Sequence, residues 1–134
     1  MTLKINYLDK QKANTKNIAL FLCKDTKISE FKGIFDDKTN LKIQKFIKNS
    51  MKIKEDKIDS LNLDFDQKIL IIFLASKNDA YKSEKNGAKL YTQIKMGKIE
   101  NITLLGSNFP SIKNKIEFSQ FLHGMELKVV EKNF

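Results

Sequence analysis

The pattern of hydrophobic and polar positions along this chain predicts a set of strands separated by helices. Two continuous apolar runs, 18–23 (IALFLC) and 69–75 (ILIIFLA), show no polar alternation and are only a few residues long. Such runs are typical of strands that are covered on both faces, as in a sheet between two layers of helices. Residues 3–8 and 100–105 are further strand candidates, and Gly106 is expected to end the second of them.

Residues 61–66 (LNLDFD) form a cleanly alternating stretch. Leucine and phenylalanine occupy the odd positions, and asparagine and aspartate occupy the even ones, which indicates a strand with one buried and one exposed face. The short step at Asp66 and Gln67 predicts that this strand folds back beside the strand at 68–74.

Three further segments have the spacing of helices. We expect Thr39 or Asn40 to cap the first, while the second runs from about Asp79 to residue 96 and ends at Gly97. The third begins near residue 118 and is the clearest. The shared faces contain Ile43, Phe46, Ile47 and Ser50 in the first helix, Gly87, Leu90, Tyr91 and Ile94 in the second, and Phe118, Phe121, Leu122, Met125 and Val129 in the third.

The order of these elements is β-β-α-β-β-α-β-α, which predicts the fold class. The strand at 69–74, the helix at 79–96 and the strand at 100–105 form a βαβ crossover, which implies some parallel pairing. We therefore predict an α/β fold, with a three-layer mixed sheet flanked by helices. At 134 residues the chain is expected to be one domain, 1–134, with enough core to fold.

The net charge of the chain makes nucleic acid a candidate partner. The formal net charge is +9, and a basic protein attracts phosphate backbones. All 25 basic residues are lysine, however, and they are spread along the chain among aspartates and glutamates. Arginine, which reads guanine edges and clamps phosphates, is absent. A solvated lysine surface is the favoured interpretation, and salt-dependent DNA binding stays open.

The sequence also indicates a compartment. The longest apolar run is far shorter than the roughly 20 residues that span a bilayer, so no membrane partner is expected. The polar N-terminus lacks the apolar stretch of a signal peptide. A single cysteine excludes an internal disulfide framework and fits a reducing cytosol, and with one histidine it excludes the usual zinc ligand sets. We expect a cytoplasmic protein.

The candidates for catalysis each have a simpler structural interpretation. His123 lies off the apolar stripe of the last helix and is expected at the surface, without a nucleophile to activate. Cys23 ends an apolar strand and is expected to be buried and inert. The turn at 106–108 (GSN) follows a strand, where α/β sheets collect ligands, but no glycine-rich phosphate loop is present.

Carboxylates and aromatic residues add no clear site. The carboxylate pairs, which are expected in polar turns or on solvent-facing sides, are Asp36 with Asp37, Glu55 with Asp56, and Asp64 with Asp66. Three aromatic residues, Tyr81, Phe109 and Phe134, are expected to be exposed, and they are too scattered to stack bases. The residues alone thus assign no catalytic, cofactor-binding or metal-binding position and indicate a binding or scaffolding domain.

Two segments resemble the leucyl (cytosol) aminopeptidase family. Residues 68–105 read strand, short loop, a helix with the pair Gly87-Ala88, then strand, as in that family. Residues 118–128 (FSQFLHGMELK) are similar to the helix that ends the N-terminal domain of the family, and 17–22 (NIALFL) is similar to its first long strand. The loose match extends over most of the chain.

The resemblance implies a non-catalytic N-terminal domain with a macro-domain-like sheet. In the family, two divalent metals, Mn or Zn, are held by the C-terminal catalytic domain, whose Asn-Thr-Asp-Ala-Glu-Gly-Arg stretch does not occur here. The implied partners are that catalytic domain, further copies in a homo-hexamer and, as in some bacterial members, DNA. The family's Gly-Leu-Gly loop is replaced at 73–76 by Phe-Leu-Ala-Ser, which brings a backbone less close to phosphate. DNA binding and macro-like nucleotide binding are the alternative functions.

Overall fold

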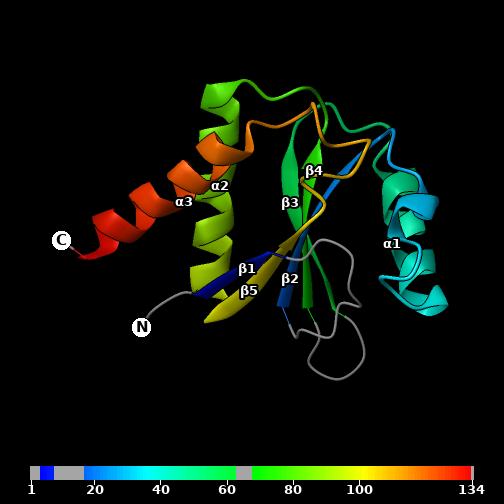
Figure 1. Ribbon diagram of the computed structural model, residues 1–134, viewed down its shortest axis with the longest axis horizontal. Coiled ribbons are helices and arrows are strands. Elements are labelled where there is room, and N and C mark those ends of the chain that lie inside the picture. Colours follow the sequence, from blue (N-terminus) through cyan, green and yellow to red (C-terminus); the bar gives the residue numbers. More distant parts are fainter. Residues whose placement is uncertain (1–3, 8–16, 63–67, 134) are drawn as a thin grey trace.

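The computed structural model describes residues 4–7, 17–62 and 68–133, and it has the predicted order of five strands and three helices (Figure 1). A short 3₁₀ helix, η1, is added after the second strand. In chain order the elements are β1 (Lys4–Tyr7), β2 (Asn17–Cys23), η1 (Ile28–Phe31), α1 (Asp37–Asn49), β3 (Lys57–Asn62), β4 (Lys68–Leu74), α2 (Ala80–Met96), β5 (Asn101–Leu105) and α3 (Phe118–Asn133).

The five strands form one mixed sheet in the order β1-β5-β2-β4-β3. The pairs β1–β5, β5–β2 and β2–β4 are parallel, whereas β3 runs antiparallel to β4. The predicted crossover from β4 through α2 to β5 is confirmed, and β2 lies between the two strands that it joins. The connection is therefore long enough to cross over a neighbouring strand, as parallel pairing requires.

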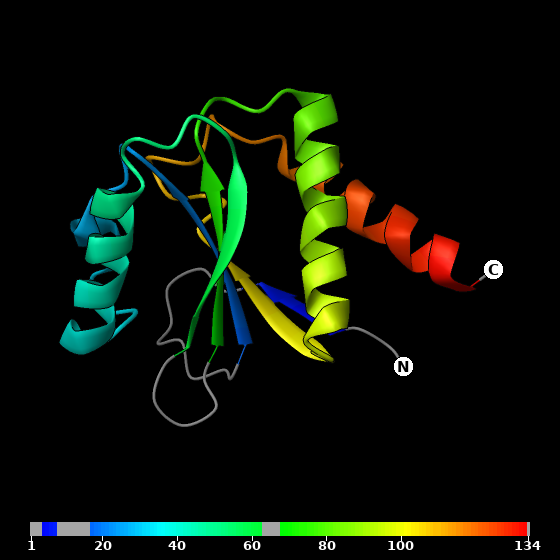
Figure 2. The same ribbon diagram turned by 180° about the vertical axis from the view of Figure 1, so that it is seen from behind.

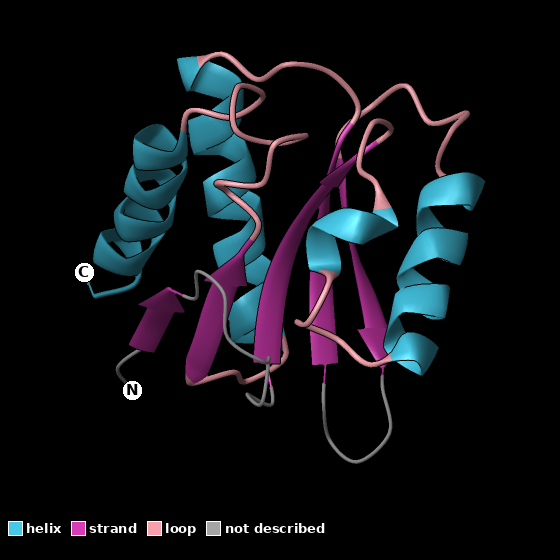
Figure 3. Cartoon of the chain, turned by 45° about the vertical axis from the view of Figure 1, so that its right-hand side comes forward, coloured by secondary structure: helices cyan, strands magenta, loops and turns pink. Residues whose placement is uncertain are grey.

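Helices cover both faces of this sheet, which confirms the predicted three-layer α/β class. Figure 2 shows α1 on one side of the strands and α2 with α3 on the other, and Figure 3 shows the same layers from another direction. The two central strands, β2 and β4, carry the apolar runs, and residues 18–23 and 69–74 are at most 3% exposed. Their continuous hydrophobicity thus follows from burial on both faces.

The start of α1 differs from the sequence prediction. Asp36 caps the helix, because its carboxylate accepts a hydrogen bond of 2.7 Å from the backbone N–H of Thr39. The prediction of Thr39 or Asn40 as the cap is wrong, since the helix begins a turn earlier, at Asp37, and Thr39 lies in its first turn. The predicted inner face is confirmed at Ile43, Ile47 and Ser50, which are buried.

The limits of α2 agree with the prediction, but the conformation at its end does not. Asp79 caps the helix by accepting a 2.7 Å hydrogen bond from the backbone N–H of Lys82. The helix stops before Gly97, as expected, yet Gly97 has a φ of −82°. The left-handed residue that follows the helix is Lys98, with a φ of 54°. A lysine therefore adopts the conformation for which the glycine was expected.

The strand predicted at 61–66 is shifted in the structure. The observed strand β3 begins at Lys57, and its antiparallel pairing with β4 is confirmed, with Leu61 opposite Ile69. The position of β3 at the edge of the sheet leaves most of its residues partly exposed, so its first half shows little alternation. Residues 63–67, and with them Asp64 and Asp66, lie outside the described residues.

The helices α2 and α3 cross in close contact. A Cβ atom on Gly87 of α2 would lie 1.9 Å from the carbonyl oxygen of Phe121, and one on Gly124 of α3 would lie 1.9 Å from the carbonyl oxygen of Glu84. Only glycine lets two helix backbones approach this closely. The position of α3 is therefore set by a pair of glycines rather than by its apolar stripe alone.

Candidate functional site

The carboxyl ends of β2 and β5 are the first candidate position for a ligand-binding site. From here the chain leaves β2 towards α1 on one face and leaves β5 towards α3 on the other (Figure 3). Ligands in α/β sheets bind where neighbouring strands diverge in this way. In this protein the segment after β5 fills the position, because Phe109 and Ile112 are buried there and Phe109 packs on Phe31 with ring centroids 5.3 Å apart.

The burial of Phe109 contradicts its predicted exposure. It follows a tight turn in which Gly106 has a φ of +105°, and the backbone N–H of Phe109 donates to the carbonyl oxygen of Gly106 over 3.1 Å. A Cβ on Gly106 would lie 3.2 Å from the carbonyl oxygen of Phe21. The stretch 106–108 therefore acts as a turn that directs an aromatic ring into the core.

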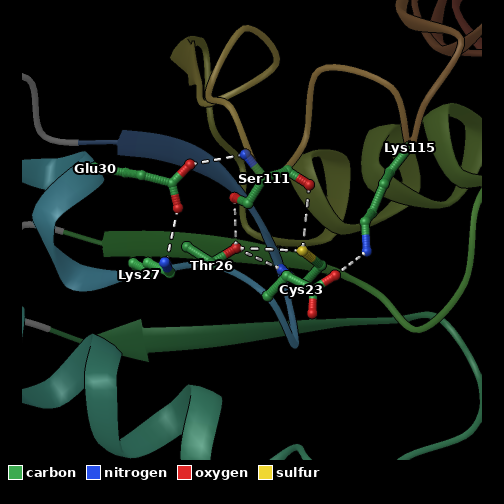
Figure 4. A network of polar contacts seen from close by, with 7 residues as sticks. Cys23, Thr26, Lys27, Glu30, Ser111 and Lys115 are labelled. Atoms are coloured by element: carbon green, nitrogen blue, oxygen red, sulfur yellow. Dashed lines mark hydrogen bonds and ion pairs between the residues drawn. The ribbon is translucent and has the colours of Figure 1, made fainter.

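A polar network closes the same end of the sheet (Figure 4). The backbone N–H of Cys23 donates to Thr26 Oγ1 over 3.0 Å, and this hydroxyl lies 3.0 Å from Ser111 Oγ. The Cys23 thiol donates to the carbonyl oxygen of Ser111 over 3.4 Å. Cys23 is fully buried, as predicted. The thiol and hydroxyls are engaged with one another, so they hold two chain segments together instead of presenting a nucleophile.

Two carboxylates extend this network. Glu30 accepts hydrogen bonds of 2.8 Å from the backbone N–H groups of Lys27 and Ser111. Asp25 pairs with Lys115 at 2.6 Å. The hydrogen bond from Lys115, and then its charge, lower the pKa of Asp25, while the hydrogen bond to Asp25 raises the pKa of Lys115. The contacts of Glu30 with Ser111 and of Asp25 with Lys115 join the segment after β2 to the segment after β5, which makes this end of the sheet a structural closure.

The second candidate position for a ligand-binding site lies beside the carboxyl end of β4. A cavity of about 290 Å³ lies between the residues that precede β3 and the first half of α2. The residues that line it all have polar or charged side chains and are Lys54, Glu55, Asp56, Ser76, Lys82, Lys85, Asn86 and Lys89. This cavity is the candidate functional site.

The inner wall of the cavity is a hydrogen-bonded cluster around Asp56. One carboxylate oxygen accepts from the backbone N–H of Ala75 at 2.7 Å, and the other accepts from the side-chain amides of Asn78 at 2.8 Å and Asn86 at 3.1 Å. The Asn86 amide also donates to Asn78 Oδ1 over 2.7 Å. Both asparagines are buried. The cluster thus fixes the loop after β4 against α2.

This arrangement corrects the interpretation of the Glu55-Asp56 pair. Glu55 is exposed, as predicted, whereas Asp56 is half-buried and points to buried amide groups. The cluster also takes up the backbone amide of Ala75, in the loop after β4. Asp56, Asn78 and Asn86 have no shared sequence motif, because 22 and 30 residues separate the aspartate from its partners.

Four of the eight lining residues are lysines. Lys82, Lys85 and Lys89 recur every three or four residues of α2, which places them on one side of the helix. Lys54 comes from the segment before β3. Lys82 donates to Ser76 Oγ over 3.4 Å, and in the described part of the chain none of the four forms an ion pair. The ammonium groups outnumber the two carboxylates, so the cavity attracts anions.

The remaining candidates lie apart from this cavity. His123 is exposed on α3 and Tyr81 is 73% exposed on α2, both as predicted. Phe134 lies outside the described residues. Within residues 4–7, 17–62 and 68–133, no three His, Cys, Asp or Glu side chains are grouped to hold a metal ion. No described helix has the length and apolar character to cross a membrane.

Comparison with known proteins assigns no family. The sequence matches no protein-family model and no curated protein. The resemblance of residues 68–105 and 118–128 to leucyl aminopeptidases therefore stays a prediction.

Proposed function

We propose that this chain is the non-catalytic N-terminal domain of a cytosolic leucyl aminopeptidase. The whole enzyme would release N-terminal amino acids from peptides, with two divalent metals in its catalytic domain polarising the carbonyl and activating water. This chain would contribute shape and contacts that assist assembly, for example into a hexamer, or regulate the catalytic domain.

The observation that supports the proposal is the packing of the two segments that carry the resemblance. Residues 68–105 build β4, α2 and β5, and residues 118–128 build the first part of α3. Gly87, from the pair Gly87-Ala88 that belongs to the resemblance, lies where α3 crosses α2. Gly124 of α3 makes the equivalent close contact with α2. A resemblance in packing residues is expected to preserve such a contact, because a side chain at either glycine would separate the helices.

An activity assay tests the first part of the proposal. The purified chain, supplied with Mn²⁺ or Zn²⁺, is expected to leave a leucine anilide intact. Hydrolysis above a blank that contains metal without protein would overturn the assignment as non-catalytic. A full-length enzyme of the family serves as the positive control for substrate and metal.

The coding sequence beyond Phe134 tests the second part. We expect the reading frame to continue into a domain with the lysine, aspartate and glutamate ligands of a two-metal site. A stop codon directly after Phe134, or a continuation without those ligands, would contradict the proposal. If the catalytic domain is present, mixing the two parts and measuring their complex by light scattering would show whether they dock.

A further inference from the structure

We propose that the cavity between residues 54–56 and α2 binds a compact anion that carries two or three linked phosphate groups. Lys54 lines one side, and Lys82, Lys85 and Lys89 line the other. This arrangement brings ammonium groups from two separate chain segments around one space. It does not rest on the aminopeptidase assignment, because the argument uses the cavity and its lysines and not the glycine contacts between α2 and α3.

The size and chemistry of the cavity select the class of ligand. About 290 Å³ is at the lower end of the range for small-molecule pockets. The lining offers ammonium, hydroxyl and amide groups, and none of the residues that line it is aliphatic or aromatic, whereas large organic ligands are held mainly by such side chains. Lysine binds phosphate as a point charge with three donors. A chain of linked phosphates matches several separated ammonium groups better than a single small anion does.

The lysines on α2 give a second argument for an anion. Lys82, Lys85 and Lys89 follow one another at about one helical turn. Like charges at this spacing destabilise a helix. In the described residues Lys85 and Lys89 have no carboxylate partner that would offset this repulsion. A bound polyphosphate would neutralise the repulsion and add hydrogen bonds at the same time.

The two carboxylates of the lining have different roles in this proposal. Asp56 accepts hydrogen bonds from three neutral N–H groups, which stabilise its carboxylate and hold the wall of the cavity in place. Glu55 is exposed at the rim and has no such donors around it in the described structure. Its charge opposes an incoming anion, and Glu55→Gln is therefore expected to tighten binding.

Calorimetric titration of the whole chain with sodium pyrophosphate, at constant ionic strength and without Mg²⁺, tests the site. The wild type is expected to bind, and the variant Lys85→Gln/Lys89→Gln to have a Kd about tenfold higher. The matched variant Lys45→Gln/Lys48→Gln, on α1 in the opposite layer, removes the same charge and is expected to keep the wild-type Kd. Circular dichroism checks that all variants are folded.

Three results would overturn the proposal. The first is no heat and no rise in melting temperature at about 10 mM pyrophosphate, since a ligand that binds the folded state must stabilise it. The second is equal weakening by the two double variants, which would mean attraction to net charge alone. The third is that the wild type binds duplex DNA but not pyrophosphate, and that Lys85→Gln/Lys89→Gln abolishes the DNA binding. The lysines would then bind a nucleic-acid backbone.

Discussion

Gly87 of α2 lies directly against the carbonyl group of Phe121 of α3, and a Cβ atom at this glycine would come within 1.9 Å of that oxygen. The backbone fixes the position of a Cβ atom, and the carbonyl oxygen is itself a backbone atom, so no side-chain rotation relieves the overlap. Gly124 faces Glu84 in the same manner from the opposite helix. The layer formed by α2 and α3 is thus held at one separation by two glycines, one on each helix.

Gly87→Ala is expected to destabilise the fold by at least about 2 kcal/mol, because the helices must move apart and the packing around Phe121 is lost. Urea denaturation followed by circular dichroism measures this change. Gly97→Ala is the matched control, since its Cβ would meet no atom closer than 3.4 Å and its φ of −82° suits alanine. A loss of stability in Gly87→Ala no larger than in Gly97→Ala would show that the helices do not depend on this contact.

The central layer of the fold was predictable because its signal is local. Residues 18–23 and 69–74 are apolar without interruption, and burial on both faces leaves no other pattern for them. The cap at Asp79 and the end of α2 were predictable for the same reason, since capping chemistry involves neighbours in sequence. These features fixed the order of the elements and, with the crossover rule, the class of the fold.

The candidate site was not predictable because its contacts join distant parts of the chain. In the sequence, Asp56 is indistinguishable from other carboxylates in polar stretches. Only the fold of β4 and α2 places Ala75, Asn78 and Asn86 around it. Phe109 was expected at the surface because it lies in a turn next to the only proline, and only the opposing Phe31 shows why it is buried. The lysines of the cavity were visible in the sequence but were indistinguishable from those on open surface.

Asp56→Asn is expected to cost about 2 kcal/mol of stability, because an amide nitrogen would face donors that now share a carboxylate, leaving a buried N–H unpaired. Asp59→Asn is the control. Asp59 is exposed, and among the described residues its carboxylate makes polar contacts only with Ser60 N–H and Lys57, so its replacement is expected to change stability by less than about 0.5 kcal/mol. Equal denaturation midpoints for the two variants would contradict a structural role for the Asp56 cluster.

Thr26→Val tests the closure at the carboxyl ends of β2 and β5. The substitution keeps the shape of the side chain but removes the hydroxyl that pairs with the Cys23 N–H and Ser111 Oγ, so a loss of about 1–3 kcal/mol is expected. Thr92→Val removes an exposed hydroxyl that donates only to the Ala88 carbonyl and should be nearly neutral. Hydrogen exchange of the Cys23 amide should accelerate in Thr26→Val alone.

The ion pair between Asp25 and Lys115 is expected to stabilise the fold only within a window of pH. The pKa of Asp25 is lowered from 3.8, so its contribution is present above that value and is lost as the pH falls through the native pKa. The pKa of Lys115 is raised from 10.5, so its contribution is lost as the pH rises through the native value. Asp25→Asn should therefore cost stability near pH 7, by no more than about 1 kcal/mol because Asp25 is 72% exposed, and progressively less as the pH falls towards 2. Denaturation of both proteins at the two pH values measures the difference, and a cost that persists at low pH would show that the charge is not its source.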